Sequence, residues 1–134
     1  MGKRASPRES GGASGFFAFE LHSTEVNAPP DLVAYTREKL TAKLAKFERR
    51  ILEVVVRLRD LNGPKGGDSF ACHMEALLPH LEPVNVEERD HDLRAAIDRT
   101  VDRLDVAVQR HVERERSLRR NRGRKLVRHV KLAP

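Results

Sequence analysis

The segment from residue 89 to residue 114, RDHDLRAAIDRTVDRLDVAVQRHVER, constrains the fold more than any other part of the chain. At about 100° per residue, its apolar side chains recur on one side of a helix. This stripe consists of Leu93, Ile97, Val101, Leu104 and Val108. Because an apolar stripe must be covered by a second layer, the segment predicts a long helix over about 91–115 that packs on a sheet or on another helix.

The charged side chains of this predicted helix are sorted by sign. The basic residues on one side of the apolar stripe are Arg99, Arg103, Arg110 and Arg114, and the acidic residues on the other side are Asp98, Asp102, Asp105 and Glu113. A helix that only needs to stay soluble usually mixes its charges, because opposite charges four residues apart stabilise it. We interpret the arginines as a basic edge that can face a polyanion. A solvated helix with chance clustering of charge remains the alternative.

The rest of the chain predicts the element order β-α-β-β-β-α. Alternating apolar residues and turn-forming residues indicate strands at 16–24, 51–61, 69–78 and 84–89, and a first helix from about residue 30 to residue 49. The residues expected to point inward from these elements are Phe17, Phe19, Leu21, Leu32, Thr36, Leu40, Leu44, Phe47, Leu52, Val54, Val56, Leu58, Phe70, Cys72, Met74 and Ala76. We expect an α+β fold with both helices on one face of a four-stranded mixed sheet, in which the first two strands are parallel.

The net charge of +6 is unevenly distributed along the 134 residues. Residues 1–15 are rich in Gly and Ser and are expected to form a disordered tail. Residues 116–134 contain eight Lys or Arg and no acidic residue, and are expected to form a disordered basic tail. The predicted domain between them, residues 16–115, carries a net charge of −4. Basic charge confined to tails and helix edges favours a directed contact with a polyanion.

Composition excludes several functional classes. With no Trp and a single Tyr, the chain lacks a platform on which single-stranded bases stack. The lone cysteine, Cys72, cannot close an intramolecular disulfide, and no segment has the length and apolarity of a signal peptide or membrane span, so we expect a cytoplasmic protein without membrane contact. His73, His80 and His91 lack metal-ligand spacing, and no nucleophile accompanies Glu87 or its acidic neighbours. We therefore expect no metal, cofactor, small-molecule substrate or enzymatic activity.

The first predicted helix also has a basic edge. Lys39, Lys43, Lys46 and Arg50 follow one another at spacings of four, three and four, at the border of the apolar stripe. Such side chains suit phosphate groups, which need only a nearby cation and no shaped pocket. If the helices lie side by side, the two basic edges could line one groove. The sequence does not decide whether these edges face each other.

Three segments of the chain are similar to a known family. They are residues 30–40 with 44–47 (PDLVAYTREKL and LAKF), residues 70–79 (FACHMEALLP), and residues 92–98 with 101–104 (DLRAAID and VDRL). Through them, residues 16–115 resemble the ribosome hibernation-promoting factor and ribosome-associated translation inhibitor family, also described as sigma-54 modulation proteins. The resemblance implies the same β-α-β-β-β-α fold.

The resemblance also implies a function. It implies binding to the small ribosomal subunit at the channel for mRNA and tRNA, so that translation is blocked and ribosomes are stored under stress. By position, the residues that match the family's basic rRNA contacts are Lys39, Lys43, Lys46, Arg50, Arg99, Arg103 and Arg110. The chain departs from the family in the loop 23–27, which lacks a basic residue, and at Arg94, where an aromatic is common. Without a second domain, the chain resembles the short form and is expected to be monomeric when free.

The basic C-terminal tail adds further candidate RNA contacts. It could follow an RNA-lined cleft and contribute salt-sensitive affinity, or remain a solvated tail. With Arg114, its candidate RNA-binding residues are Arg119, Arg120, Arg122, Arg124 and Lys125. Two other functions stay open: a general module that binds structured RNA by its shape, like double-stranded-RNA domains, and a protein–protein adaptor that uses an acidic surface on the sheet side.

Overall fold

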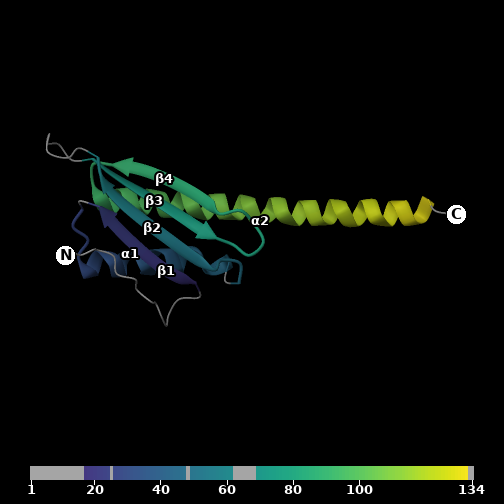
Figure 1. The fold of residues 1–134 in the computed structure, drawn as a ribbon, viewed down its shortest axis with the longest axis horizontal. Coiled ribbons are helices and arrows are strands. Elements are labelled where there is room, and N and C mark those ends of the chain that lie inside the picture. The colour runs from purple at the N-terminus through teal and green to yellow at the C-terminus, as the bar shows by residue number, and fades with distance from the viewer. Residues whose placement is uncertain (1–16, 25, 48, 62–68, 133–134) are drawn as a thin grey trace.

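The computed structural model describes residues 17–24, 26–47, 49–61 and 69–132, with side chains up to residue 123. The predicted tail 1–15 lies outside the described residues. The predicted order of strands and helices is confirmed (Figure 1). The elements are β1 (Ala18–Thr24), α1 (Pro30–Lys43), the 3₁₀ turn η1 (Ala45–Phe47), β2 (Glu53–Asp60), β3 (Phe70–Leu77), β4 (Val84–Asp90) and α2 (Leu93–Leu132).

The four strands form one mixed sheet in the order β1-β2-β3-β4. β1 and β2 are parallel, with Leu21 opposite Val56, as expected for strands joined through a helix. The other neighbours are antiparallel, and Met74 pairs with Val56 on one side and Val86 on the other. This register places the inward residues of adjacent strands in rows on one face of the sheet.

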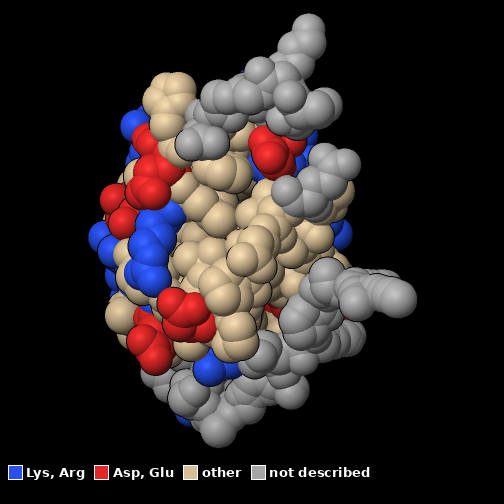
Figure 2. Space-filling model, turned by 90° about the vertical axis from the view of Figure 1, so that its left-hand side faces the viewer, with Lys and Arg blue, Asp and Glu red and all other residues tan. Residues whose placement is uncertain are grey.

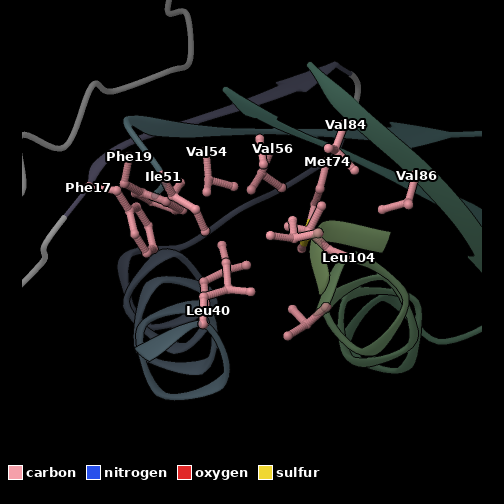
Figure 3. Close-up of a cluster of buried hydrophobic side chains, with 14 of the residues drawn as sticks. Phe17, Phe19, Leu40, Ile51, Val54, Val56, Met74, Val84, Val86 and Leu104 are labelled. Atoms are coloured by element: carbon pink, nitrogen blue, oxygen red, sulfur yellow. The ribbon is translucent and has the colours of Figure 1, made fainter. Parts of the chain in front are cut away.

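Both helices cover that face. In Figure 3, side chains of the strands point toward Leu40 of α1 and Leu104 of α2, which lie below different parts of the sheet. Leu40, Met74 and Leu104 are completely buried, and α2 packs against β3 and β4. The hydroxyl of the buried Thr100 lies 3.2 Å from the backbone carbonyl oxygen of Cys72 in β3. The predicted α+β layer arrangement is therefore confirmed.

Three details of the core differ from the prediction. Leu52, expected to point inward, is 58% exposed, because the chain bends before β2 begins and Ile51 enters the core in its place. Phe70 is only half-buried, since it lies at the end of β3 opposite Asp60 and Asp90. The first helix ends at Lys43 instead of residue 49, and the tighter turn η1 that follows brings Phe47 into the core.

The second helix begins as predicted but extends further. The Asp92 carboxylate accepts a hydrogen bond from the backbone N–H of Ala95 at 3.1 Å and so caps its first turn. The helix was predicted to end near residue 115, yet residues 116–132 continue it, because that segment contains good helix formers and no proline. Val112 is the last buried residue among the described side chains of α2. We call residues 116–132 the C-terminal arm, which projects beyond the sheet (Figure 1).

At 40 residues, α2 is about 60 Å long at the usual rise of about 1.5 Å per residue. Charged side chains interrupt its apolar residues throughout. Within the described part of the chain, no helix combines the length and apolarity needed to cross a membrane.

The burial of Cys72 predicts an unreactive thiol. Cys72 is fully buried, and this burial raises the pKa of its thiol to about 12. Since the thiolate is the reactive form, only about one thiol in ten thousand is ionised at pH 8. We expect no reaction of the native protein with a thiol-reactive dye within an hour, and complete reaction within minutes in concentrated urea. Fast stoichiometric labelling of the native protein would contradict this burial.

Candidate nucleic-acid interface

The lysine edge of α1 contacts the acidic edge of α2. The three lysines pair in order with three aspartates at matching spacings, which we call the lysine–aspartate ladder. Its pairs are Lys39–Asp98 at 3.3 Å, Lys43–Asp102 at 3.1 Å and Lys46–Asp105 at 2.9 Å. The separation of charges on α2 thus has a structural role, because its acidic side faces the basic side of the neighbouring helix.

An aromatic residue lies at one end of this ladder. The Tyr35 hydroxyl donates a hydrogen bond to Asp98 Oδ1 at 2.5 Å, and this bond raises the pKa of Tyr35. The Arg94 guanidinium lies over the Tyr35 ring, 4.3 Å from its centroid. Arg94 therefore packs on an aromatic residue of α1 and holds the start of α2 beside it.

The other end of the ladder is the most buried. The side chain of Asp105 is 13% exposed, whereas that of Asp102 is 64% exposed. The Lys46 ammonium lies 2.9 Å from Oδ1 of Asp105 and donates a hydrogen bond to Oδ2 at 3.2 Å. A nearly buried carboxylate needs such a partner, because leaving it unpaired costs its full desolvation energy.

The arginine edge of α2 faces the strand β4. Arg99 and Arg103 both donate hydrogen bonds to the carboxylate of Glu88, whose side chain is 16% exposed. The hydrogen bond from Arg103 is the main cause that lowers the pKa of Glu88, and the bond from Arg99 adds to it. Arg99 also lies 3.8 Å from Asp90. Arg99 and Arg103, two of the candidate RNA contacts, are therefore paired with carboxylates of β4.

The two basic edges do not face each other. The lysines of α1 lie against the acidic side of α2, and Arg99 and Arg103 lie on the β4 side of that helix. Figure 2, which views the molecule from the left-hand side of Figure 1, shows blue and red atoms adjoining along one edge and neither colour at the centre. Along that edge the described residues therefore present mixed charge.

Several basic side chains further along α2 have no counter-charge among the described residues. Arg110 and Arg114 are exposed and have no ion-pair partner among the described residues, and the same holds for Arg122 in the arm. Arg119 pairs with Glu115 at 2.6 Å, and Arg120 donates a hydrogen bond to Ser117 at 3.4 Å. The predicted contacts Arg124 and Lys125 lie beyond the described side chains.

Two adjacent arginines, Arg49 and Arg50, follow η1. Arg50, a predicted contact, is half-buried just after η1, and Arg49 beside it is exposed. Neither has an ion-pair partner in the described part of the chain. Sequence reasoning did not single out Arg49, although the Arg49-Arg50 dipeptide was a signal. Within the same described part, no group of three or more His, Cys, Asp or Glu side chains is arranged to hold a metal ion.

The ladder predicts unequal effects of two similar substitutions. Lys46→Met removes the charge next to the nearly buried Asp105 and should lower the free energy of unfolding by about 1–3 kcal/mol. Lys43→Met leaves Asp102 without its partner, but Asp102 is exposed, so the free energy of unfolding should fall by less than about 1 kcal/mol. Urea unfolding at pH 7 measures both. Equal effects of the two substitutions would show that Asp105 does not depend on Lys46.

The Glu88 pair predicts a pH-dependent contribution to stability. Because the folded state lowers the pKa of Glu88, the ionised pair stabilises the fold at neutral pH and loses this effect as the pH falls below about 4.3, the usual value in an unfolded chain. Glu88→Gln should therefore destabilise the protein by about 1 kcal/mol at pH 7. The difference in stability between the two proteins should shrink as the pH falls below about 4.3 and disappear once Glu88 is protonated in the folded state. A difference in the free energy of unfolding between the two proteins that does not change with pH would show that Glu88 is not stabilised by its ionised pair.

Comparison with known proteins places this arrangement in a family. A family model described as "Sigma 54 modulation protein / S30EA ribosomal protein" matches residues 19–116. Among solved structures, the N-terminal domain of Protein Y from Thermus thermophilus is similar, with 32% identity and a TM-score of 0.58. This match covers 70% of the present chain and 96% of that domain. No curated protein matches the chain. On the family match, the chain belongs to the sigma-54 modulation protein / S30EA ribosomal protein family.

Proposed function

We propose that this protein is a ribosome-associated translation inhibitor that binds the small ribosomal subunit at the channel for mRNA and tRNA. Membership of a family described as S30EA ribosomal protein supports ribosome association. The observation that supports the contact itself is the row of arginines without an ion-pair partner along α2 from Arg110 onward. In this proposal the protein blocks translation by occupying the channel under stress, in the cytoplasm, and performs no chemical step.

The part of α2 from Arg110 onward is the main RNA contact in this proposal. Arg110 and Arg114 lie on one side of the helix and are exposed. The arm continues this helix with basic residues and without acidic ones. Ribosomal RNA presents phosphates along its backbone, and each arginine that neutralises one releases counter-ions. Affinity is therefore expected to concentrate where arginines have no internal partner.

The paired basic residues contribute less in this account. The side chains of Lys43, Lys46 and Arg103 remain 43%, 52% and 61% exposed, so a phosphate can approach them. Exposed ion pairs are worth little and are readily shared with a second anion. The neighbouring carboxylates, however, repel that anion. Lys39, Lys43, Lys46, Arg99 and Arg103 are therefore proposed as secondary contacts on the flanks of the main one.

Charge reversal on α2 tests this proposal. The double variant Arg110→Glu and Arg114→Glu should bind small ribosomal subunits at least about tenfold more weakly at 150 mM salt, since two phosphate contacts become repulsive. The matched control, Arg57→Glu and Arg89→Glu, makes the same charge change at exposed positions on the opposite face of the sheet and should bind like the wild type. Co-sedimentation measures binding, and circular dichroism confirms the fold.

Other outcomes of this experiment favour other functions. Equal loss in the test variant and the control would show general electrostatic attraction instead of a contact along α2. Equal affinity of the wild type for free duplex RNA and for the subunit would favour a general RNA-binding module. Binding that does not weaken between low and high salt would favour a protein partner.

A further inference from the structure

A pocket lined by basic residues lies where three segments of the fold meet. Arg49 and Arg50 follow η1, the turn between β3 and β4 contributes residues 78–81, and α2 contributes Glu115 and Arg119. The cavity has a volume of about 190 Å³. It lies past the last buried residue of α2, Val112, at the base of the C-terminal arm.

The charges around this pocket are unbalanced. Glu115 is its one acidic residue among the lining residues, and its carboxylate lies 2.6 Å from Nε of Arg119. Arg49 and Arg50 have no ion-pair partner within the described residues, so two guanidinium groups remain uncompensated. Guanidinium groups held together without a counter-charge repel each other, and they favour a bound anion, because their N–H groups match two oxygens of a phosphate.

The turn between β3 and β4, which lines the same pocket, has an unusual backbone. His80 has a φ of 63°, in the left-handed region that residues other than glycine rarely adopt. This conformation is consistent with the imidazole lining the pocket, where its ring can donate a hydrogen bond. Next to it, the buried Leu78 and the half-buried Leu81 form an apolar wall that limits the water around a bound group. Strain of this kind concentrates at binding sites.

We propose that this pocket binds a phosphate group of ribosomal RNA, with Arg49 and Arg50 as its principal ligands. The proposal rests on the proposed function, which supplies the RNA. The location of the pocket favours RNA as the source of the phosphate. Arg119 lines the pocket and also belongs to α2, whose exposed arginines precede it along the helix. The pocket would fix where the base of the arm sits on the RNA backbone.

Two variants of the full chain test the pocket. Arg49→Gln with Arg50→Gln removes both uncompensated charges at surface positions. His80→Gly removes the imidazole, and glycine adopts the positive φ without strain. The matched control is Arg57→Gln with Arg89→Gln on the outer face of the sheet. Thermal unfolding of all variants checks that each is folded.

The first readout is the amide NMR spectrum of the wild type during titration with a short RNA hairpin, and separately with inorganic phosphate. We expect the hairpin to shift the amide signals of residues 49–50 and 80–81, and phosphate to shift the same signals at millimolar concentration. Unchanged signals in both titrations would overturn the proposal. Shifts with phosphate but not with the hairpin would overturn RNA as the source.

The second readout is co-sedimentation with small ribosomal subunits. We expect Arg49→Gln with Arg50→Gln to weaken binding about fivefold to tenfold, His80→Gly to weaken it less, and the control to bind like the wild type. Wild-type affinity of the arginine variant would overturn the pocket proposal and leave the proposed function standing. If the wild type does not bind subunits, the proposed function fails, and the hairpin titration alone then decides whether the pocket binds RNA phosphate.

Discussion

The buried layer between one face of the sheet and the two helices determines the rest of this structure. Leu40 of α1 and Leu104 of α2 both point into it, so the helices must lie side by side on the same face of the sheet. Burial of apolar surface supplies most of the stability of such a layer. Side-by-side packing then brings the flanks of the helices together, and the charges on those flanks have to be compatible.

The lysine–aspartate ladder meets this requirement. Its ion pairs are mostly exposed and contribute little stability individually. Like charges at the same positions would repel across the whole helix pair, so the ladder specifies which side of α2 faces α1. The same logic applies on the other side of α2, where Glu88 receives Arg99 and Arg103. The domain thus neutralises much of its own basic charge, and among the described residues Arg49, Arg50, Arg110 and Arg114 keep no ion-pair partner.

Patterns within short segments predicted most of the fold. The site was predicted less well, because its side chains pair with residues far away in the sequence. Alternating residues located the strands, and helical spacing located Leu40, Val101 and Leu104 in the core, because these signals lie within a few residues of each other. The prediction that Leu52 is buried was wrong, because a bend before β2 interrupts the alternation of inward and outward residues. The role of Asp105 was hidden, because its partner Lys46 lies 59 residues away. The pocket around Arg49 was missed because three separate segments form it.

We propose that the protein reaches ribosomal RNA through α2 from Arg110 onward while the lysine–aspartate ladder stays intact. A cryo-electron microscopy structure of the full chain bound to the small ribosomal subunit tests this most directly. We expect RNA phosphates within hydrogen-bonding distance of Arg110 and Arg114, and an unbroken ion pair between Lys46 and Asp105. A complex that contacts RNA through the outer face of the sheet, or one in which the lysines leave their aspartates to bind phosphates, would contradict it.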